Sequence, residues 1–132
     1  MKRTLAAASA LIAALAASAC AQTEPIGGQS RAPAPAVVAA GQPVNCVRVA
    51  DILQTRVYDD QTIDFVMRNR TRYRNTLASR CPDLGREKRF GYKITTGNLC
   101  SVDTITVLIQ GSSIPGATCG LSQFAPVKLA GG

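Results

Sequence analysis

The chain has 132 residues, a formal net charge of +7, no His and no Trp. At this length a single folded domain is expected. Without His, a single chain cannot build a Ser-His-Asp or Cys-His mechanism or an imidazole zinc site. The basic balance favours anionic neighbours such as lipid headgroups, acidic glycans or nucleic acid, without choosing among them.

Residues 1–19 have the pattern of a secretory signal peptide. Lys2 and Arg3 precede an uncharged run rich in Ala and Leu, which is too short to span a bilayer as a stable helix. The run ends in Ala17-Ser18-Ala19, and small residues ahead of a cleavage site are typical of exported chains. We therefore predict export and removal of this leader.

Cys20 follows the small residues directly, and this arrangement resembles the lipobox of bacterial lipoproteins, although Leu usually stands where this chain has Ala17. Lipidation would place palmitate-type acyl chains on Cys20 and make it the first mature residue. The five cysteines favour this outcome, because paired cysteines leave one over. Ala21, which is not Asp, favours the outer membrane. Cleavage before Gln22 is the alternative, and it would release a soluble periplasmic protein.

Residues 20–45 form the next segment, in which the lipidated N-terminus continues into a Pro- and Ala-rich stretch. Ala32-Pro33-Ala34-Pro35 favours polyproline II, and the segment shows no periodic apolar face. We expect a disordered linker that separates the domain from the membrane. Val37 and Val38 leave open the alternative of an added edge strand.

From residue 46 to 132 the pattern changes to short segments in which apolar and polar residues alternate. A period of two with one apolar face is typical of half-buried strands, and the apolar positions are rich in β-branched and aromatic residues. The alternating apolar-face positions are Ile63/Phe65/Met67, Tyr73/Asn75/Leu77, Phe90/Tyr92/Ile94 and Ile105/Val107/Ile109.

Turn-forming residues separate these segments at spacings that favour a meander over βαβ units. The pattern predicts a mainly all-β domain: a small antiparallel barrel or sandwich of five to six strands, with one short helix around residues 47–53. A domain this small buries too little surface to be comfortably stable without covalent cross-links.

Four cysteines lie within this segment, at Cys46, Cys81, Cys100 and Cys119. In an exported chain they indicate two disulfides. Their wide spacing does not fit a Cys₄ metal site or a Cys-x-x-Cys redox motif. We expect no metal and no cofactor. Spacing alone leaves three pairings open.

The segment from Cys46 to Val127 resembles an uncharacterised proteobacterial family of small exported proteins, a domain of unknown function with four cysteines. The resemblance implies a small β-rich domain in the cell envelope, with Cys81 paired to Cys119 and, by remainder, Cys46 to Cys100. It implies no activity. The matching motifs are Cys46-Val47-Arg48, Asp59-Asp60-Gln61-Thr62-Ile63, Tyr73-Arg74-Asn75-Thr76-Leu77, Cys81-Pro82-Asp83-Leu84, Leu99-Cys100-Ser101-Val102-Asp103, Cys119-Gly120-Leu121 and Phe124-Ala125-Pro126-Val127.

Arginines occupy every second position from Arg68 through Arg70 and Arg72 to Arg74. They are candidates for binding phosphate or carboxylate groups. The plainer interpretation, which we favour, is a solvated strand face whose charges discourage edge pairing. Tyr73 alternates to the opposite face, which argues against nucleic-acid binding.

The acidic residues Asp59, Asp60 and Asp64 are expected to be turn formers rather than a catalytic pair. Asp103 is expected to make a local hydrogen bond at the start of a strand, and residues 111–116 to form a hairpin loop. No catalytic residues can be assigned. We expect a non-enzymatic outer-membrane lipoprotein facing the periplasm, anchored in the membrane by its lipid. Its folded part would be a structural or interaction module for an envelope protein or an anionic glycan or lipid. The alternative is a periplasmic module that binds an anionic ligand through the arginines.

Overall fold

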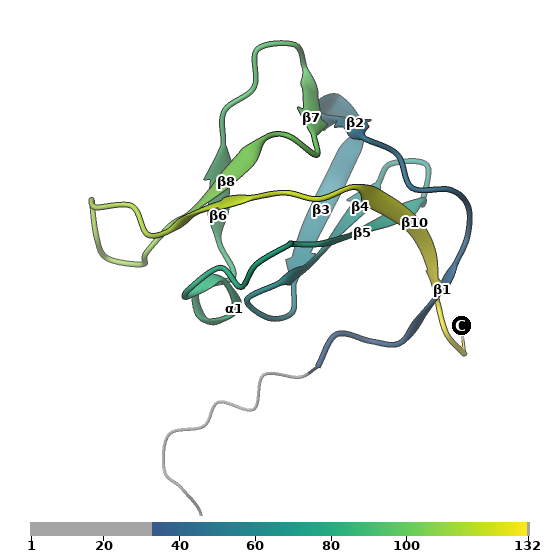
Figure 1. The fold of residues 1–132 in the computed structure, drawn as a ribbon, viewed down its shortest axis with the longest axis horizontal. Helices are drawn as coiled ribbons and strands as arrows, with labels where there is room; N and C mark the ends of the chain where they lie inside the picture. The colour runs from purple at the N-terminus through teal and green to yellow at the C-terminus, as the bar shows by residue number, and fades with distance from the viewer. Residues whose placement is uncertain (1–32, 132) are drawn as a thin grey trace, which may run out of the picture.

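The computed structural model describes residues 33–131. In this part of the chain, ten short strands form three antiparallel sheets, joined by one 3-10 turn and one single-turn helix (Figure 1). The predicted all-β class is confirmed, although the strands are shorter and more numerous than the five or six expected. The predicted leader and Cys20 lie outside the described residues.

A five-stranded sheet with the order β1-β10-β5-β4-β3 dominates the fold. Along β4 the apolar residues Ile63, Phe65 and Met67 alternate with Asp64 and Val66, so the sheet has one core face and one outer face. The strands are β1 (Val37–Ala39), β3 (Ile52–Val57), β4 (Thr62–Met67), β5 (Arg72–Thr76) and β10 (Phe124–Leu129).

Two smaller sheets complete the domain. One is the pair β2 (Cys46–Arg48) and β7 (Asn98–Cys100). The other has the order β6-β8-β9. Its strands are β6 (Phe90–Tyr92), β8 (Thr104–Val107) and β9 (Thr118–Gly120).

The core lies between the inner face of the large sheet and the smaller sheets. Phe65 is fully buried and meets Phe124 edge-on at a centroid distance of 5.3 Å and Phe90 at 6.3 Å. Asn75 is also fully buried, and both polar atoms of its side chain form hydrogen bonds with the backbone of Ser122. Its Nδ2 donates to the Ser122 carbonyl at 2.6 Å, and its Oδ1 accepts from the Ser122 N–H at 3.0 Å.

Part of the segment predicted to be a disordered linker is a strand. Residues 37–39 pair with β10 in the register Val37↔Leu129 to Ala39↔Val127, and Val44 bridges to Phe124. The edge-strand alternative is therefore the correct one. Three-residue strands give no periodic signal, and the free edge of β10 supplies the hydrogen-bonding partner that the sequence pattern does not reveal.

The short helix expected around residues 47–53 is reduced to a 3-10 turn, Val49–Asp51, between β2 and β3. The helix α1 (Leu84–Glu87) was not predicted. It has a single turn, too short for an apolar period, and both flanking residues, Asp83 and Lys88, have left-handed backbone conformations.

Two disulfides join Cys46 to Cys100 and Cys81 to Cys119, in the pairing that the family resemblance implies. The first joins directly opposed residues of β2 and β7. The second joins the segment before α1 to β9. No helix among residues 33–131 is long and apolar enough to cross a membrane.

Candidate functional site

The four alternating arginines divide into two pairs. Arg68 and Arg70 lie in the turn that closes the β4–β5 hairpin, where Arg68 Nε donates to the Ala50 carbonyl at 3.0 Å and Arg70 has a φ of 70°. Arg72 and Arg74 lie on β5 and share the outer face of the large sheet. A turn at Asn69 separates the two pairs, and the Asn69 Oδ1 accepts the Thr71 N–H at 3.0 Å.

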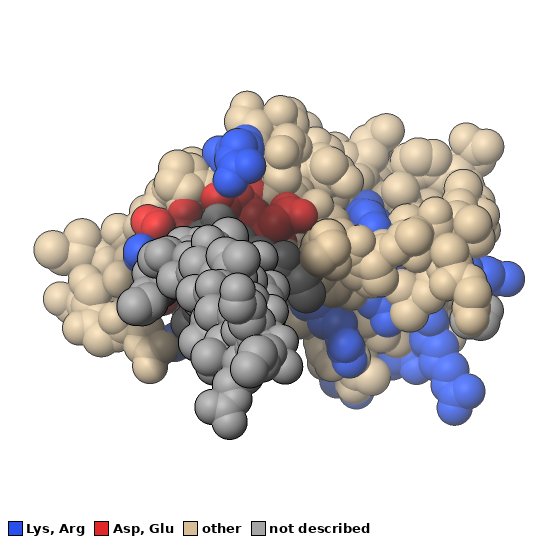
Figure 2. Space-filling model, turned by 90° about the horizontal axis from the view of Figure 1, so that it is seen from below, with Lys and Arg blue, Asp and Glu red and all other residues tan. Residues whose placement is uncertain are grey.

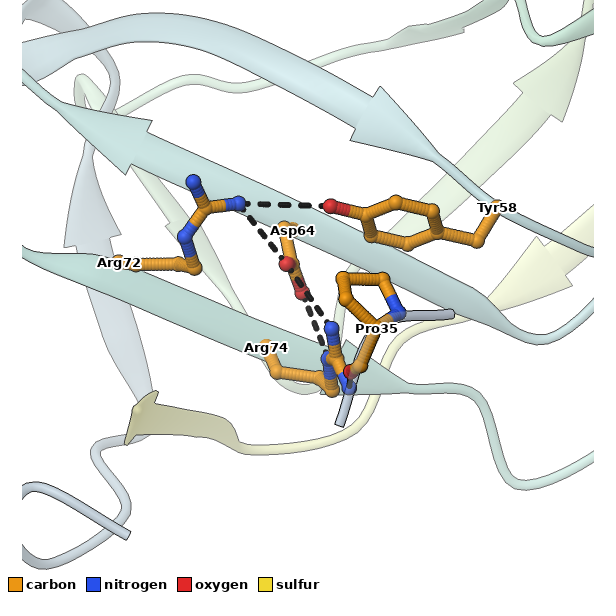
Figure 3. Close-up of polar contacts among 5 residues, drawn as sticks. All are labelled: Pro35, Tyr58, Asp64, Arg72 and Arg74. Carbon is orange, nitrogen blue, oxygen red and sulfur yellow. Dashed lines mark hydrogen bonds and ion pairs between the residues drawn. The ribbon is translucent and has the colours of Figure 1, made fainter. Parts of the chain in front are cut away.

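Asp64 lies between Arg72 and Arg74 on this outer face (Figure 3). It is directly opposite Arg74 in the β4–β5 ladder, and its side chain is fully buried. Arg74 binds it through two nitrogens, Nε to Oδ1 at 2.7 Å and Nη2 to Oδ2 at 3.0 Å, while Arg72 Nη1 donates to Oδ2 at 3.0 Å. We call Arg72, Asp64 and Arg74 the ion triad.

Two sequence-based interpretations are thereby corrected. The side chains of Arg72 and Arg74 are only 18% and 12% exposed, so they do not form a solvated face. Asp64 lies in the middle of β4 and is not a turn residue. A buried carboxylate requires paired charges and hydrogen bonds, and the two arginines supply both.

Tyr58 and Pro35 cover the ion triad (Figure 3). The Tyr58 hydroxyl accepts a hydrogen bond from Arg72 Nη1 at 3.4 Å, and its ring centre lies 5.5 Å from the Arg74 guanidinium carbon. Arg74 Nη1 donates to the Pro35 carbonyl at 2.9 Å. The triad therefore fixes the segment that leads into β1 against the sheet.

The outer face keeps a positive balance. Hydrogen bonds to the Asp64 carboxylate raise the pKa of Arg74 above its ordinary value, so the guanidinium stays charged. Two guanidinium groups face one carboxylate, and exposed Arg56 lies opposite Asp64 on β3. Within residues 33–131, Arg56 has no ion-pair partner within 4.0 Å.

A shallow groove of about 650 Å³ adjoins the ion triad, and Arg74 contributes to its lining. Its apolar lining includes Val37, Ala125 and Val127, and its polar lining includes Ser122 and Gln123. Ala125 lies opposite Arg74 in the β10–β5 ladder, so both residues are on the outer face. The groove therefore places an apolar surface beside a cationic group.

The other three acidic residues considered in the sequence analysis, Asp59, Asp60 and Asp103, have structural roles. Asp59 Oδ1 accepts the Gln61 N–H at 2.8 Å, which is the predicted turn interaction. Asp60 contacts α1 instead: its Oδ1 accepts the Gly85 N–H at 2.8 Å, and its Oδ2 pairs with Arg80 at 2.8 Å. Asp103 Oδ2 accepts the Cys100 N–H at 2.7 Å just before β8, as predicted.

Charge is unevenly distributed around the domain. Figure 2 shows the acidic side chains of one face gathered in a patch, with most Lys and Arg side chains of that face apart from it. The last residue of α1, Glu87, accepts the Gln110 N–H on its Oε2 at 3.0 Å. That hydrogen bond, aided by Arg86, lowers the pKa of Glu87 below its usual value.

Residues 108–117 connect β8 to β9 and contain the loop predicted at residues 111–116. The described residues contain no group of three or more Cys, Asp or Glu side chains that could hold a metal ion.

A family model described as a family of unknown function, DUF6491, matches residues 1–130. The chain belongs to this family. Neither the curated proteins nor the solved structures contain a match. The DUF6491 assignment confirms the resemblance to a domain of unknown function and brings no substrate or catalytic residue with it.

Sequence reasoning missed the ion triad, although a signal was present. Asp64 and Arg74 are equally distant from Asn69, and a hairpin centred on Asn69 sets them opposite each other. It also missed the groove, because Val37, Ala125 and Arg74 come from three separate strands of the large sheet.

Proposed function

We propose that this DUF6491 chain is a non-enzymatic lipoprotein of the cell envelope whose folded domain is an interaction module. One observation carries the proposal: all four cysteines of the domain are used in two disulfides. They leave Cys20, directly behind a signal-like segment, as the odd cysteine. Stable disulfides are typical of oxidising compartments outside the cytoplasm.

The docking of Pro35 on the sheet shortens the tether that a lipidated Cys20 would provide. Residues 21–34 would then separate the anchor from the first fixed contact, a reach of at most about 50 Å for a fully extended chain. The outer face of the large sheet, with its groove and ion triad, is the surface nearest to the point where that tether joins the domain. We propose this face as the interaction surface.

Two measurements test the lipoprotein proposal. Intact-mass analysis of the mature protein is expected to show acyl chains on Cys20, and two or more chains are expected because a single chain anchors only marginally. A Cys20→Ala variant is expected to move from the membrane fraction to the soluble fraction. A wild-type N-terminus at Gln22 without added mass would contradict lipidation.

The interaction surface is tested by crosslinking in cells. A photocrosslinking residue replacing Gln123, which lines the groove, is expected to give a discrete adduct with an envelope component. The same residue replacing Lys93, which is exposed and does not line the groove, serves as the control. Equal adducts from the two positions would argue against a specific surface.

A second candidate function is binding of an anionic ligand in the groove, favoured by the position of Arg74 beside its apolar lining. Retention on vesicles containing phosphatidylglycerol, compared with phosphatidylcholine alone, is expected to fall steeply with salt. Arg56 lies outside the groove but in the same row of the outer face as Arg74, so Arg56→Ser should weaken the positive field and reduce retention without breaking the ion triad. Lys93→Ser should leave retention unchanged. Retention that is insensitive to both salt and Arg56→Ser would exclude this function.

A further inference from the structure

The two disulfides lie in different surroundings. Cys46 is exposed and Cys100 is half-buried, on two strands that form a small sheet of their own. Cys81 is fully buried within the hydrophobic core, and its partner Cys119 is half-buried. The first bridge therefore reaches the surface through Cys46, whereas the second has one end inside the core.

The two bridges also differ in the surroundings of the sulfur that an exchange reaction would expel. Thiol–disulfide exchange expels one sulfur as a thiolate, and the rate falls when that thiolate is poorly stabilised. Attack on Cys119 would expel the Cys81 thiolate into an apolar core, where an unpaired charge is costly. Attack on Cys46 expels the thiolate of Cys100, which is half-buried and not enclosed in the core as Cys81 is.

Two arginines and one aspartate, Asp51, line the hollow beside Cys46, so its charge is positive on balance. Cys46 borders a hollow of about 350 Å³ whose lining includes Arg48 and Arg68. Arg48 lies two residues along β2, on the same side of the strand as Cys46, and its side chain is 73% exposed. Because the attacking species is a thiolate, nearby arginines raise its local concentration.

We propose that Cys46–Cys100 is a thiol–disulfide exchange site that accepts electrons from a dithiol reductant, while Cys81–Cys119 is a permanent cross-link. A thiolate of the reductant attacks Cys46 Sγ, forming a mixed disulfide and breaking the Cys46–Cys100 bond, and Cys100 leaves as a thiolate that takes up a proton. The second thiol of the reductant then attacks its own sulfur in the mixed disulfide. It releases Cys46 as a thiolate, which is then protonated, so two electrons have passed to the bridge and the reductant has become a disulfide.

The hydrogen bonds between β2 and β7 remain available after reduction, since they belong to the backbone. The buried bridge and the core are not involved in the exchange. The reduced form is therefore expected to keep the fold while exposing a free thiol beside Arg48 and Arg68.

The experiment uses the mature chain, folded and with both bridges formed, and dithiothreitol as the dithiol probe at about 25 °C. Free thiols are alkylated at successive times and assigned by peptide mapping. Cys46 and Cys100 are expected to react at least about 100-fold faster than Cys81 and Cys119, at a rate proportional to dithiothreitol and unchanged by about 1 M urea. Equal rates for both bridges, or rates that rise with urea for both, would overturn the proposal.

The role of the arginines is tested with glutathione, an anionic thiol, as the probe. The variant carrying Arg48→Ser and Arg68→Ser is expected to form the mixed disulfide on Cys46 about two- to fivefold more slowly at low salt, and the difference should vanish at high salt. Lys93→Ser is the control and should react like the wild type. An unchanged rate in the double variant would overturn the assignment of these arginines to the site. Both measurements are independent of the state of Cys20, so they can fail or succeed separately from the lipoprotein proposal.

Discussion

Asp64 on β4 and Arg74 on β5 are directly opposed residues that meet through two nitrogen–oxygen contacts, at 2.7 and 3.0 Å, on the outer face of the sheet. The carboxylate is fully buried although it points away from the hydrophobic core. It is covered by arginine side chains and by the segment that carries Pro35. A polar cluster on the outer face therefore joins β4 to β5 and fixes the N-terminal segment of the domain.

The first prediction concerns this cluster. Asp64→Asn leaves two guanidinium groups close together without the carboxylate that neutralises them. Breaking one side of a buried ion pair typically costs 3–5 kcal/mol, and we expect a loss of about 3 kcal/mol in the free energy of unfolding because the arginines keep some solvent access. Urea denaturation measures this loss.

Asp51→Asn is the matched control, because Asp51 is half exposed and its nearest approach to Arg48 is 3.9 Å. An exposed pair of this kind contributes at most about 1 kcal/mol. If the two variants lost equal stability, the ion triad would have no special role. By the same reasoning, replacing Arg70, Arg72 and Arg74 together with Ser is expected to destabilise the domain strongly, in contrast to the mild effect that a solvated face would predict.

The second prediction concerns the contact between α1 and the β3–β4 turn. A Cβ added at Gly85 would lie 2.9 Å from the Cα and carbonyl carbon of Asp59, so the backbone would have to move. We expect Gly85→Ala to cost about 1–3 kcal/mol, the usual range for overpacking. Thermal unfolding is the measurement. Gly120→Ala is the control, because a Cβ there meets nothing within 4 Å, and a similar shift in both variants would contradict the close approach.

How much of this molecule the sequence predicts depends on the length of the elements. The β4–β5 hairpin is long enough for its alternation to be read, and Ile63, Phe65 and Met67 lie on the core face as predicted. The three residues of β1 are too few for a period, and only the pairing with β10 makes them a strand. Alternation also placed Arg72 and Arg74 correctly on one face.

What the sequence pattern lacks is the pairing register. Arg72 and Arg74 look like solvated charges until Asp64 is placed between them, and that placement depends on which residues of two strands are opposed. The groove depends further on β10, which is distant in the chain from β5. Local alternation predicts faces, whereas the neighbours across a sheet come from tertiary structure.

The third prediction is a pH dependence. The pKa of Glu87 in the folded protein is lowered from 4.5, chiefly by the hydrogen bond from the Gln110 N–H. A lowered pKa in the folded state stabilises the protein above the unfolded pKa, and this contribution is lost as the pH falls through the folded value. Glu87→Gln is therefore expected to be less stable than wild type at neutral pH, with a difference that shrinks below about pH 4.5. Urea denaturation between about pH 7 and 3 measures it, and a difference that stays constant across this range would contradict the assignment.

The last prediction compares the two disulfides, whose loops span 54 residues for Cys46–Cys100 and 38 residues for Cys81–Cys119. In the chain-entropy model each bridge stabilises the domain by roughly 3–4.5 kcal/mol, and the longer loop has an advantage of only about 0.3 kcal/mol. Cys81, however, is fully buried in the core, and truncating a buried side chain leaves a void that costs about 1 kcal/mol or more. Packing therefore outweighs loop length.

We expect wild type to be the most stable protein and the variant with Cys46→Ala and Cys100→Ala to be less stable. The variant with Cys81→Ala and Cys119→Ala is expected to be the least stable and largely unfolded at 37 °C. Thermal unfolding of the three proteins followed by circular dichroism decides the order. The reverse order of the two variants would mean that loop entropy dominates and that the burial of Cys81 contributes little.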